Sequence, residues 1–265
     1  MSRKLHHFFK IDCIVLPPTK RTGVTQTVHL AYVRERVGHA LIGARQWIPA
    51  EHLADADTAA GMGIADGLAF RTKGQLAIDI RTDAYADGVA FDFARGDEVY
   101  GSCTQLRQFF EEQQQAYVLR VASSFMLTLN PQTRMTCAQA VALLATDKPR
   151  WQIRPAGAGS KGQRWYAWAW IATVSPRHYL LVRRHLKNGD LAYHYCYVPQ
   201  GQPLTLARLV RAAGLRWPVD VSHPWCTRSR VGLSSRVASF GRGLSRWLGP
   251  ASAGVIALRA GPAFA

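Results

Sequence analysis

The chain has 265 residues, of which 48% are hydrophobic and 19% charged, so it can bury the core of one domain, with or without an insertion. These fractions exclude wholesale disorder and a coiled coil. Lysine and arginine number 33 against 17 acidic residues, and the resulting formal net charge of +16 points to a polyanionic partner, most often nucleic acid.

The positive charge is concentrated at the two ends of the sequence. Residues 1–22 contain five basic residues and one acid, and residues 221–265 contain six arginines with no lysine and no acid. The ends therefore carry +10 of the +16, while residues 23–220 hold 16 of the 17 acids. This distribution predicts a globular core of ordinary charge between two abnormal end segments.

The cysteines and the apolar segments point to a cytoplasmic protein without a membrane partner. The five cysteines are too far apart in sequence to form a CxxC pair, and their odd number favours reduced thiols: Cys13, Cys103, Cys137, Cys196 and Cys226. The apolar run at 14–16 is too short for a signal peptide. Arg259 and Pro262 interrupt the apolar stretch at 251–265, which is too short to span a bilayer.

The first half of the chain predicts strands and helices in alternation. Alternating β-branched and polar residues predict two strands, over Thr27–Tyr32 and Ala40–Ile48, that form a hairpin. Apolar residues spaced four apart predict a helix over 74–86. The pattern then predicts a strand at 89–94, a helix at 104–115 and a strand at 117–121. This order indicates an α/β fold.

From residue 122 the pattern changes to one that is dominated by strands. A helix is predicted at 136–145, followed by strands at 151–154, 165–174, 178–184 and 192–198, and a helix returns at 204–213. We therefore expect a β-rich insertion at 122–200. Tyr166, Trp168 and Trp170 share one face of a strand, with Trp165 on the other. That face either packs a sheet, which is the commoner role, or stacks on nucleic-acid bases.

Asp97 is the acid best placed to carry chemistry. It lies in the run GDEVYG, where a short apolar strand ends and just before a helix. Carboxylates at strand ends of α/β folds face the crevice where ligands bind, and such a carboxylate can hold Mg²⁺. Its position alone favours the simpler role of a cap for the helix at 104–115. Asp220, which follows Pro218, is by itself interpreted as a surface acid.

Several well-known catalytic motifs are absent from the sequence. There is no GxSxG and no GxxxxGK[ST], which argues against a serine hydrolase and a P-loop NTPase. The histidines show no HExxH or other metal-binding spacing.

Longer stretches resemble a known family. They include TVHLAYVRERVGHALIGARQWIP, FRTKGQLAIDI, FARGDEVYGSCTQLRQFFE, AYVLRV, WYAWAWIATVSPRHYLLVRRHL and LAYHYCYVPQGQPLTLARLVRAAGLRWPV. In this order they resemble bacterial insertion-sequence transposases of the DDE-superfamily endonuclease type, in the group numbered seven hundred and one. The resemblance covers about residues 23–219.

The resemblance implies an RNase H-like core interrupted by a β-rich insertion. It also implies cleavage and joining of DNA at transposon ends and target, with two Mg²⁺ ions held by three acids. A homo-oligomer on DNA is a further possibility. By this match Asp97 is the second metal ligand. Asp12 is the acid available for the first position and Asp220 for the third.

The two ends of the chain depart from the family pattern. Residues 1–22 do not match the family, and Asp12 lies closer to Thr27 than the pattern has it. Asp220 stands where the family has glutamate, and Pro224 would break a helix one turn later. The arginine-, serine- and glycine-rich composition of 221–265 is typical of a sequence read out of frame.

The sequence therefore predicts five segments. They are a displaced N-terminal segment at 1–22, the first part of the core at 23–121, the insertion at 122–200, a return helix of the core at 201–220, and a disordered or out-of-frame tail at 221–265. The functional hypothesis is a transposase remnant without catalytic competence. One alternative is a basic DNA-binding fragment that interferes with an intact transposase. Another is an active metal nuclease that uses Asp12, Asp97 and Asp220.

Overall fold

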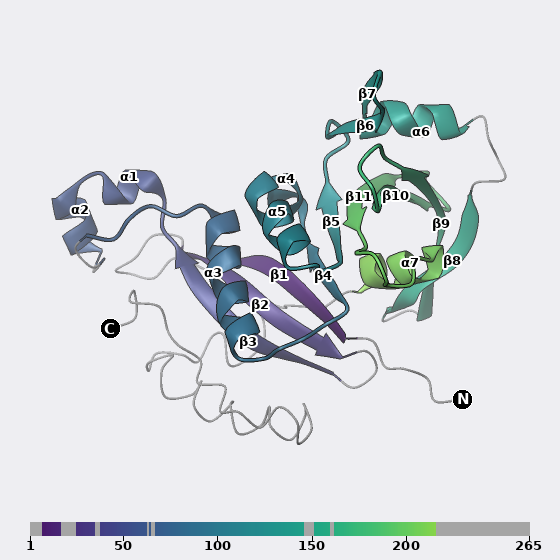
Figure 1. Cartoon of the computed structure of the whole chain (residues 1–265). Coiled ribbons are helices and arrows are strands. Elements are labelled where there is room, and N and C mark those ends of the chain that lie inside the picture. The colour runs from purple at the N-terminus through teal and green to yellow at the C-terminus, as the bar shows by residue number, and fades with distance from the viewer. Residues whose placement is uncertain are drawn as a thin grey trace. The chain divides into compact units, whose positions relative to one another are not determined.

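The computed structural model describes residues 7–16, 25–34, 38–62, 64, 67–145, 151–159 and 162–215 (Figure 1). The chain divides into two compact units. The first unit contains the described residues up to Ala90, and the second unit is Phe91–Trp217. The predicted boundaries at residues 122 and 201 both fall inside the second unit.

The first unit is built on three antiparallel strands in the order β3-β2-β1. Their bounds are β1 (His7–Leu16), β2 (Thr25–Arg34) and β3 (Gly38–Trp47). The hairpin predicted from the alternating pattern is confirmed as β2 and β3, each longer than predicted. Ile11 and Leu30, which are partners across β1 and β2, are both fully buried and form part of the core.

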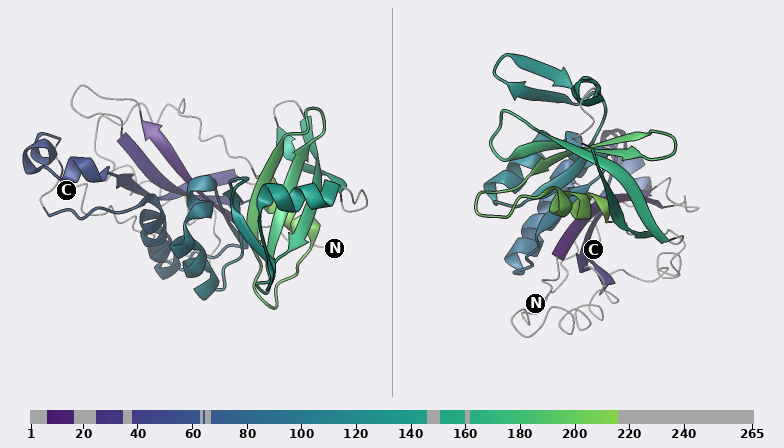
Figure 2. Two further views of the ribbon diagram at one scale, coloured as in Figure 1. Left: turned by 90° about the horizontal axis from the view of Figure 1, so that it is seen from above. Right: turned by 90° about the vertical axis from the view of Figure 1, so that its right-hand side faces the viewer.

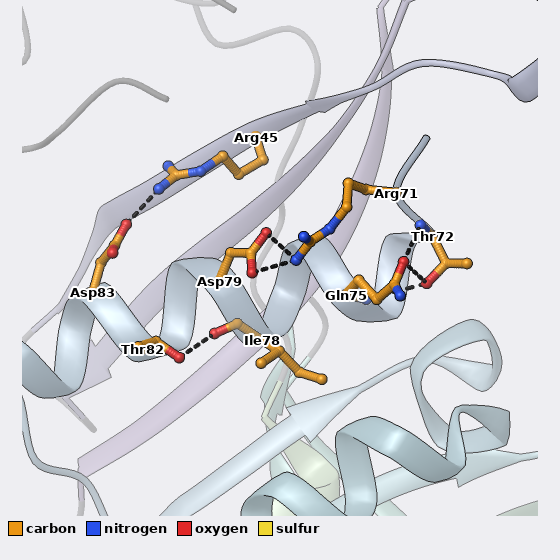
Figure 3. Close-up of polar contacts among 8 residues, drawn as sticks. All are labelled: Arg45, Arg71, Thr72, Gln75, Ile78, Asp79, Thr82 and Asp83. Atoms are coloured by element: carbon orange, nitrogen blue, oxygen red, sulfur yellow. Dashed lines mark hydrogen bonds and ion pairs between the residues drawn. The ribbon is translucent and has the colours of Figure 1, made fainter. Parts of the chain in front are cut away.

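Two short helices and one long helix follow the hairpin: α1 (Ala50–Leu53), α2 (Ala56–Gly61) and α3 (Lys73–Ala86). Helix α3 begins with a capping box, shown in Figure 3. The Thr72 hydroxyl accepts a hydrogen bond from the Gln75 amide at 3.2 Å, and the Gln75 side chain accepts one from the Thr72 amide at 2.9 Å. Two ion pairs on the same helix join Arg71 with Asp79 and Arg45 of β3 with Asp83.

Helix α3 packs on β2 and β3 through the apolar stripe expected from its sequence. Leu76, Ile80 and Ala84 are all buried. Gly43 on β3 lets the helix approach closely, because a Cβ atom at this position would lie 2.2 Å from Ile80 Cγ2. The close packing of α3 on β3 therefore depends on the absence of a side chain at Gly43 as well as on the apolar residues of the helix.

Gly43→Ala is expected to lower the free energy of unfolding by about 1–3 kcal/mol, because the added methyl group overpacks a β-branched core residue. Gly61→Ala is the matched control, since a Cβ atom at Gly61 meets nothing within 4 Å. Urea unfolding followed by circular dichroism measures both variants. Equal unfolding midpoints for the two would contradict the close approach of α3 to β3.

The predicted strand at 89–94 begins later than expected. The Gly88 amide bonds to the Tyr85 carbonyl and the Val89 amide bonds to the Ala84 carbonyl, each at 2.9 Å. These bonds close the end of α3, with Gly88 at a φ of 72°, where glycine carries no steric cost. The strand itself, β4, therefore runs only from Phe93 to Gly96.

The second unit contains a large mixed sheet of six strands in the order β4-β5-β11-β10-β9-β8. Strand β4 is parallel to β5, and the other pairs are antiparallel. The remaining bounds are β5 (Tyr117–Val121), β8 (Gln152–Gly159), β9 (Gly162–Ala172), β10 (His178–His185) and β11 (Leu191–Tyr197). The twist of these strands is visible in Figure 2.

The four later strands, β8 to β11, are the ones predicted as a separate insertion. Instead they continue the sheet that starts with β4 and β5, because β11 pairs with β5 from Tyr193↔Val121 to Tyr197↔Tyr117. The structure therefore does not confirm an insertion at 122–200. The predicted return helix is present as α7 (Leu206–Gly214), and it contacts β4 and β5 as well as β8 (Figure 1).

Further elements cover the sheet of the second unit. They are α4 (Glu98–Ser102), α5 (Thr104–Glu112), the hairpin of β6 (Met126–Asn130) and β7 (Thr133–Thr136), and α6 (Cys137–Ala145). Leu127 of β6 and Val141 of α6 lie in one buried cluster with Leu180 and Val182 of β10. Helices α5 and α6 were predicted from the sequence, whereas α4 and the hairpin were not.

The aromatic residues of β9 pack the sheet, as the commoner interpretation predicted. Trp168 is fully buried, and the ring of Tyr166 lies edge-on to it with centroids 6.2 Å apart. Trp170 stacks on Tyr179 at 5.2 Å. Trp165, on the opposite face, is 51% exposed. Three of the four rings thus serve the fold.

No helix within the described part of the chain is long and apolar enough to cross a membrane. Cys103, Cys137 and Cys196 are free thiols, and the last two are buried. Burial raises the pKa of the Cys137 thiol to about 12. A thiol with so high a pKa is a poor nucleophile at neutral pH, so its role is packing.

Candidate active site at the end of strand β4

The GDEVYG run forms a turn that begins where β4 ends. Asp97 follows the last strand residue and is the N-cap of α4, with its Oδ1 accepting a hydrogen bond from the Val99 amide at 2.9 Å. The predicted capping of the helix at 104–115 is wrong, because α5 starts after Cys103 without any side-chain cap. Asp97 caps the preceding short helix instead.

The cap bond by itself does not prevent Asp97 from binding a metal ion, because a carboxylate has two oxygens and about four lone-pair positions. The side chain is partly exposed at the end of a strand in a mixed α/β unit. Such an oxygen donor suits Mg²⁺.

Two glycines hold the turn against β5. A Cβ atom at Gly101 would lie 1.8 Å from the Arg120 carbonyl oxygen, so only glycine allows α4 to sit on this strand. At Gly96 the same atom would lie 2.9 Å from Tyr100 Cβ, and Tyr100 is fully buried beneath the turn. The glycines and the tyrosine of the motif therefore fix where the Asp97 backbone lies.

Glu98 adds a weaker tether between the turn and the sheet. Its Oε1 lies 3.0 Å from Arg120 Nε, with both side chains about half exposed. An exposed pair of this kind contributes only about 0.2–1 kcal/mol. The pair matters for position more than for stability, because it keeps the Arg120 side chain beside the Asp97 turn.

The other two candidate acids are placed less completely. Asp12 lies on β1, paired in register with His29 of β2, so its position on a strand is confirmed. Asp220 lies outside the described residues. Asp12 belongs to the first unit and Asp97 to the second. That these acids share one metal site remains a prediction.

The described side chains do not fit a complete two-metal centre. Within the described residues no three histidine, cysteine, aspartate or glutamate side chains lie close enough together to hold a metal ion. Asp97 supplies the oxygen chemistry that Mg²⁺ requires, but two ions need several carboxylates between them. Among the described residues, Asp97 therefore does not by itself make a two-metal centre.

A buried polar network in the second unit was not foreseen from the sequence. Glu111 Oε1 accepts a hydrogen bond from the Tyr117 hydroxyl at 2.7 Å and lies 3.1 Å from His178 Nε2. Burial alone would raise the pKa of Glu111, but the bonds from His178 and Tyr117 outweigh burial and lower that pKa below its ordinary value. The network ties α5 to β5 and β10. Its members lie too far apart in sequence for any local pattern to reveal it.

Comparison with known proteins identifies the family. The family described as DDE superfamily endonuclease matches residues 13–161, which is more than half of the chain and includes the whole Asp97 turn. The chain belongs to the DDE superfamily endonucleases. No curated protein matched the chain in a sequence comparison. Membership in the DDE family implies DNA as the partner and divalent metal ions for catalysis. The mixed α/β architecture is consistent with an RNase H-like fold.

Proposed function

We propose that this DDE-family chain is derived from an insertion-sequence transposase of the group numbered seven hundred and one, that it binds DNA, and that it does not cleave it. The observation that carries the proposal is the Asp97 turn. It lies inside the family match, at the end of a strand, where a carboxylate can hold a divalent metal ion. Asp97 is accordingly the second ligand of the ancestral metal centre.

The proposed loss of cleavage rests on the third acid. The family has a glutamate where this chain has Asp220, whose side chain is one methylene shorter. Pro224 follows one turn later and would interrupt the helix that should carry this acid. A misplacement of about 1 Å can reduce a rate on the order of a hundredfold, since in-line phosphoryl transfer depends on fixed geometry.

Cleavage of supercoiled plasmid in Mg²⁺ or Mn²⁺ tests this proposal. We expect no metal-dependent nicking by the unaltered chain, by Asp97→Ala or by Asp87→Ala, an exposed acid at the end of α3 that serves as the control. Nicking by the unaltered chain and by Asp87→Ala that vanishes in Asp97→Ala would overturn the proposed inactivity. That result would favour the active nuclease that uses Asp12, Asp97 and Asp220.

The second candidate function, interference with an intact transposase, is favoured by the charge of the chain. Residues 1–22 and 221–265 carry +10 of the +16. We expect duplex DNA to bind without marked sequence preference, with an affinity that falls steeply as salt rises, because phosphate contacts release counterions. Anisotropy titrations of the full chain and of residues 1–220, which keep strand β1, measure how much the last 45 residues contribute to the salt slope. An unchanged slope in the shorter chain would show that residues 221–265 are not the contact surface.

A further inference from the structure

Three arginines and a buried histidine lie on one face of the sheet in the second unit. Arg120 of β5 is the direct cross-strand partner of His194 of β11. His194 is in turn the partner of Leu181 of β10, and Arg183 lies two residues further along β10. Residues two apart on a strand share a face, so Arg120, His194 and Arg183 point to the same side.

Arg95 of β4 completes the group. It pairs in register with Val118 of β5, which lies two residues before Arg120 and hence on the same face. Directly opposite residues have Cβ atoms about 5 Å apart and diagonal neighbours about 7–8 Å, within the reach of a guanidinium group. We call Arg95, Arg120 and Arg183 the arginine cluster.

His194 lies between these side chains and is buried. It is 3% exposed, and its Nδ1 has no hydrogen-bond partner among the described residues. Its ring lies 6.3 Å from that of Trp168, which is fully buried.

The electrostatics around His194 agree with the register, which places the three arginines on its side of the sheet. Burial lowers the pKa of His194 to about 3, and the charges of Arg95, Arg183 and Arg120 lower it in the same direction. A neutral histidine is the form that three nearby cations tolerate. A negatively charged ligand at the same place would be attracted by all three guanidinium groups.

The cluster is partly exposed and lies next to the candidate active site. The Arg120 side chain is half exposed, and Arg95 and Arg183 are only partly buried. Arg95 precedes Asp97 by two residues on the same strand and turn, and Arg120 pairs with Glu98. An anion held by the arginines would therefore lie beside the Asp97 carboxylate.

We propose that the arginine cluster binds a phosphate group of the DNA backbone beside Asp97. The proposal rests on the DNA-binding function proposed above and names the surface of the second unit that performs it. The planar guanidinium group of arginine suits phosphate binding, because its fork of N–H donors matches the geometry of the phosphate oxygens. His194 and Trp168 are buried side chains on the same face of the sheet as the three arginines.

The first experiment measures DNA affinity of the full chain at several salt concentrations. Arg95→Gln, Arg120→Gln and Arg183→Gln are each compared with Arg134→Gln, an exposed arginine on β7 that serves as the control. Each cluster variant should bind severalfold more weakly, equally for all sequences, with a salt slope smaller by about 1. Arg134→Gln should match the unaltered chain. Cluster variants that also match it would overturn the proposal.

The second experiment uses inorganic phosphate alone and NMR of the His194 ring. Phosphate should shift the His194 resonances in the unaltered chain and in Arg134→Gln, and shift them less in Arg120→Lys, which keeps the charge but loses the fork. Circular dichroism establishes that each variant is folded. A shift with phosphate but no binding of DNA would overturn the proposed DNA function and leave an anion site. Absence of any shift, with unchanged DNA affinity in the variants, would overturn the site itself.

Discussion

Gly101→Ala is expected to lower the free energy of unfolding by roughly 3 kcal/mol or more, at least as much as Gly43→Ala. The added Cβ atom would lie 1.8 Å from the Arg120 carbonyl oxygen and 2.8 Å from its carbonyl carbon. Both atoms belong to β5, whose neighbours β4 and β11 hold it from either side. The strand cannot yield as a flexible side chain would, so α4 must move away.

The measurement is urea unfolding of the full chain, with Ser102→Ala as the control one residue further along. Ser102 is exposed, and its hydroxyl donates only to the Val99 carbonyl at 3.0 Å, so its loss should change the free energy of unfolding by less than about 1 kcal/mol. A Gly101→Ala chain with the same urea midpoint as Ser102→Ala would show that α4 does not rest on β5.

Local sequence patterns account for most individual elements. The stripe of Leu76, Ile80 and Ala84 predicts α3, and the alternation in residues 27–48 predicts the β2–β3 hairpin, because periodicity reports directly which face of an element is buried. Short elements escape this reasoning. Helix α4 is a single turn held by contacts of Gly101 with a strand that follows it in sequence.

The pairing of strands that lie far apart in the sequence could not be predicted from local patterns. Residues 122–200 show only strands and one helix, which suggests a separate β-rich lobe, yet β11 pairs with β5 and joins the same sheet. Strand pairing between segments that lie far apart in sequence depends on which hydrophobic faces meet, not on the pattern within either segment. The arginine cluster was missed for the same reason, since register alone brings Arg120 and His194 together.

The candidate site was only partly predictable. Asp97 could be singled out because a strand, a glycine and an acid follow one another directly in the sequence. The helix that Asp97 caps could not be predicted, because the choice between the helix at 104–115 and α4 depends on the backbone angles at the turn. Asp12 and Asp220 rest on the resemblance to the family, because neither lies in a local pattern as distinctive as GDEVYG.

Acid is expected to destabilise the second unit through His194. The pKa of this group is about 3 in the folded chain, against its ordinary value of 6.5, because of burial and then the charges of Arg95, Arg183 and Arg120. Between these two values the unfolded chain binds a proton that the folded chain does not. Stability therefore falls as pH falls from about 6.5 towards 3, by up to about 1.4 kcal/mol per pH unit, and His194 has no such effect above pH 7.

The polar network of Glu111, Tyr117 and His178 makes a second acid-sensitive contribution to stability, at a lower pH. The pKa of Glu111 is lowered from 4.5, so its contribution is present above pH 4.5 and is lost as pH falls through the folded value. Between pH 6.5 and 4.5 Glu111 stays charged in both states, so the difference between the unaltered chain and a His194 variant reports His194 in this range.

Urea unfolding at pH 6.5, 5.5 and 4.5 provides the test, with His194→Gln as the variant that cannot titrate. We expect the free energy of unfolding of the unaltered chain to fall by about 2–3 kcal/mol over this range. The His194→Gln variant should be less stable at pH 6.5. Its free energy of unfolding should depend less on pH, because only the titratable groups that both chains share contribute to that dependence. Parallel pH profiles would mean that His194 takes up a proton in the folded state, and the lowering of its pKa by burial and by the three arginines would then be wrong.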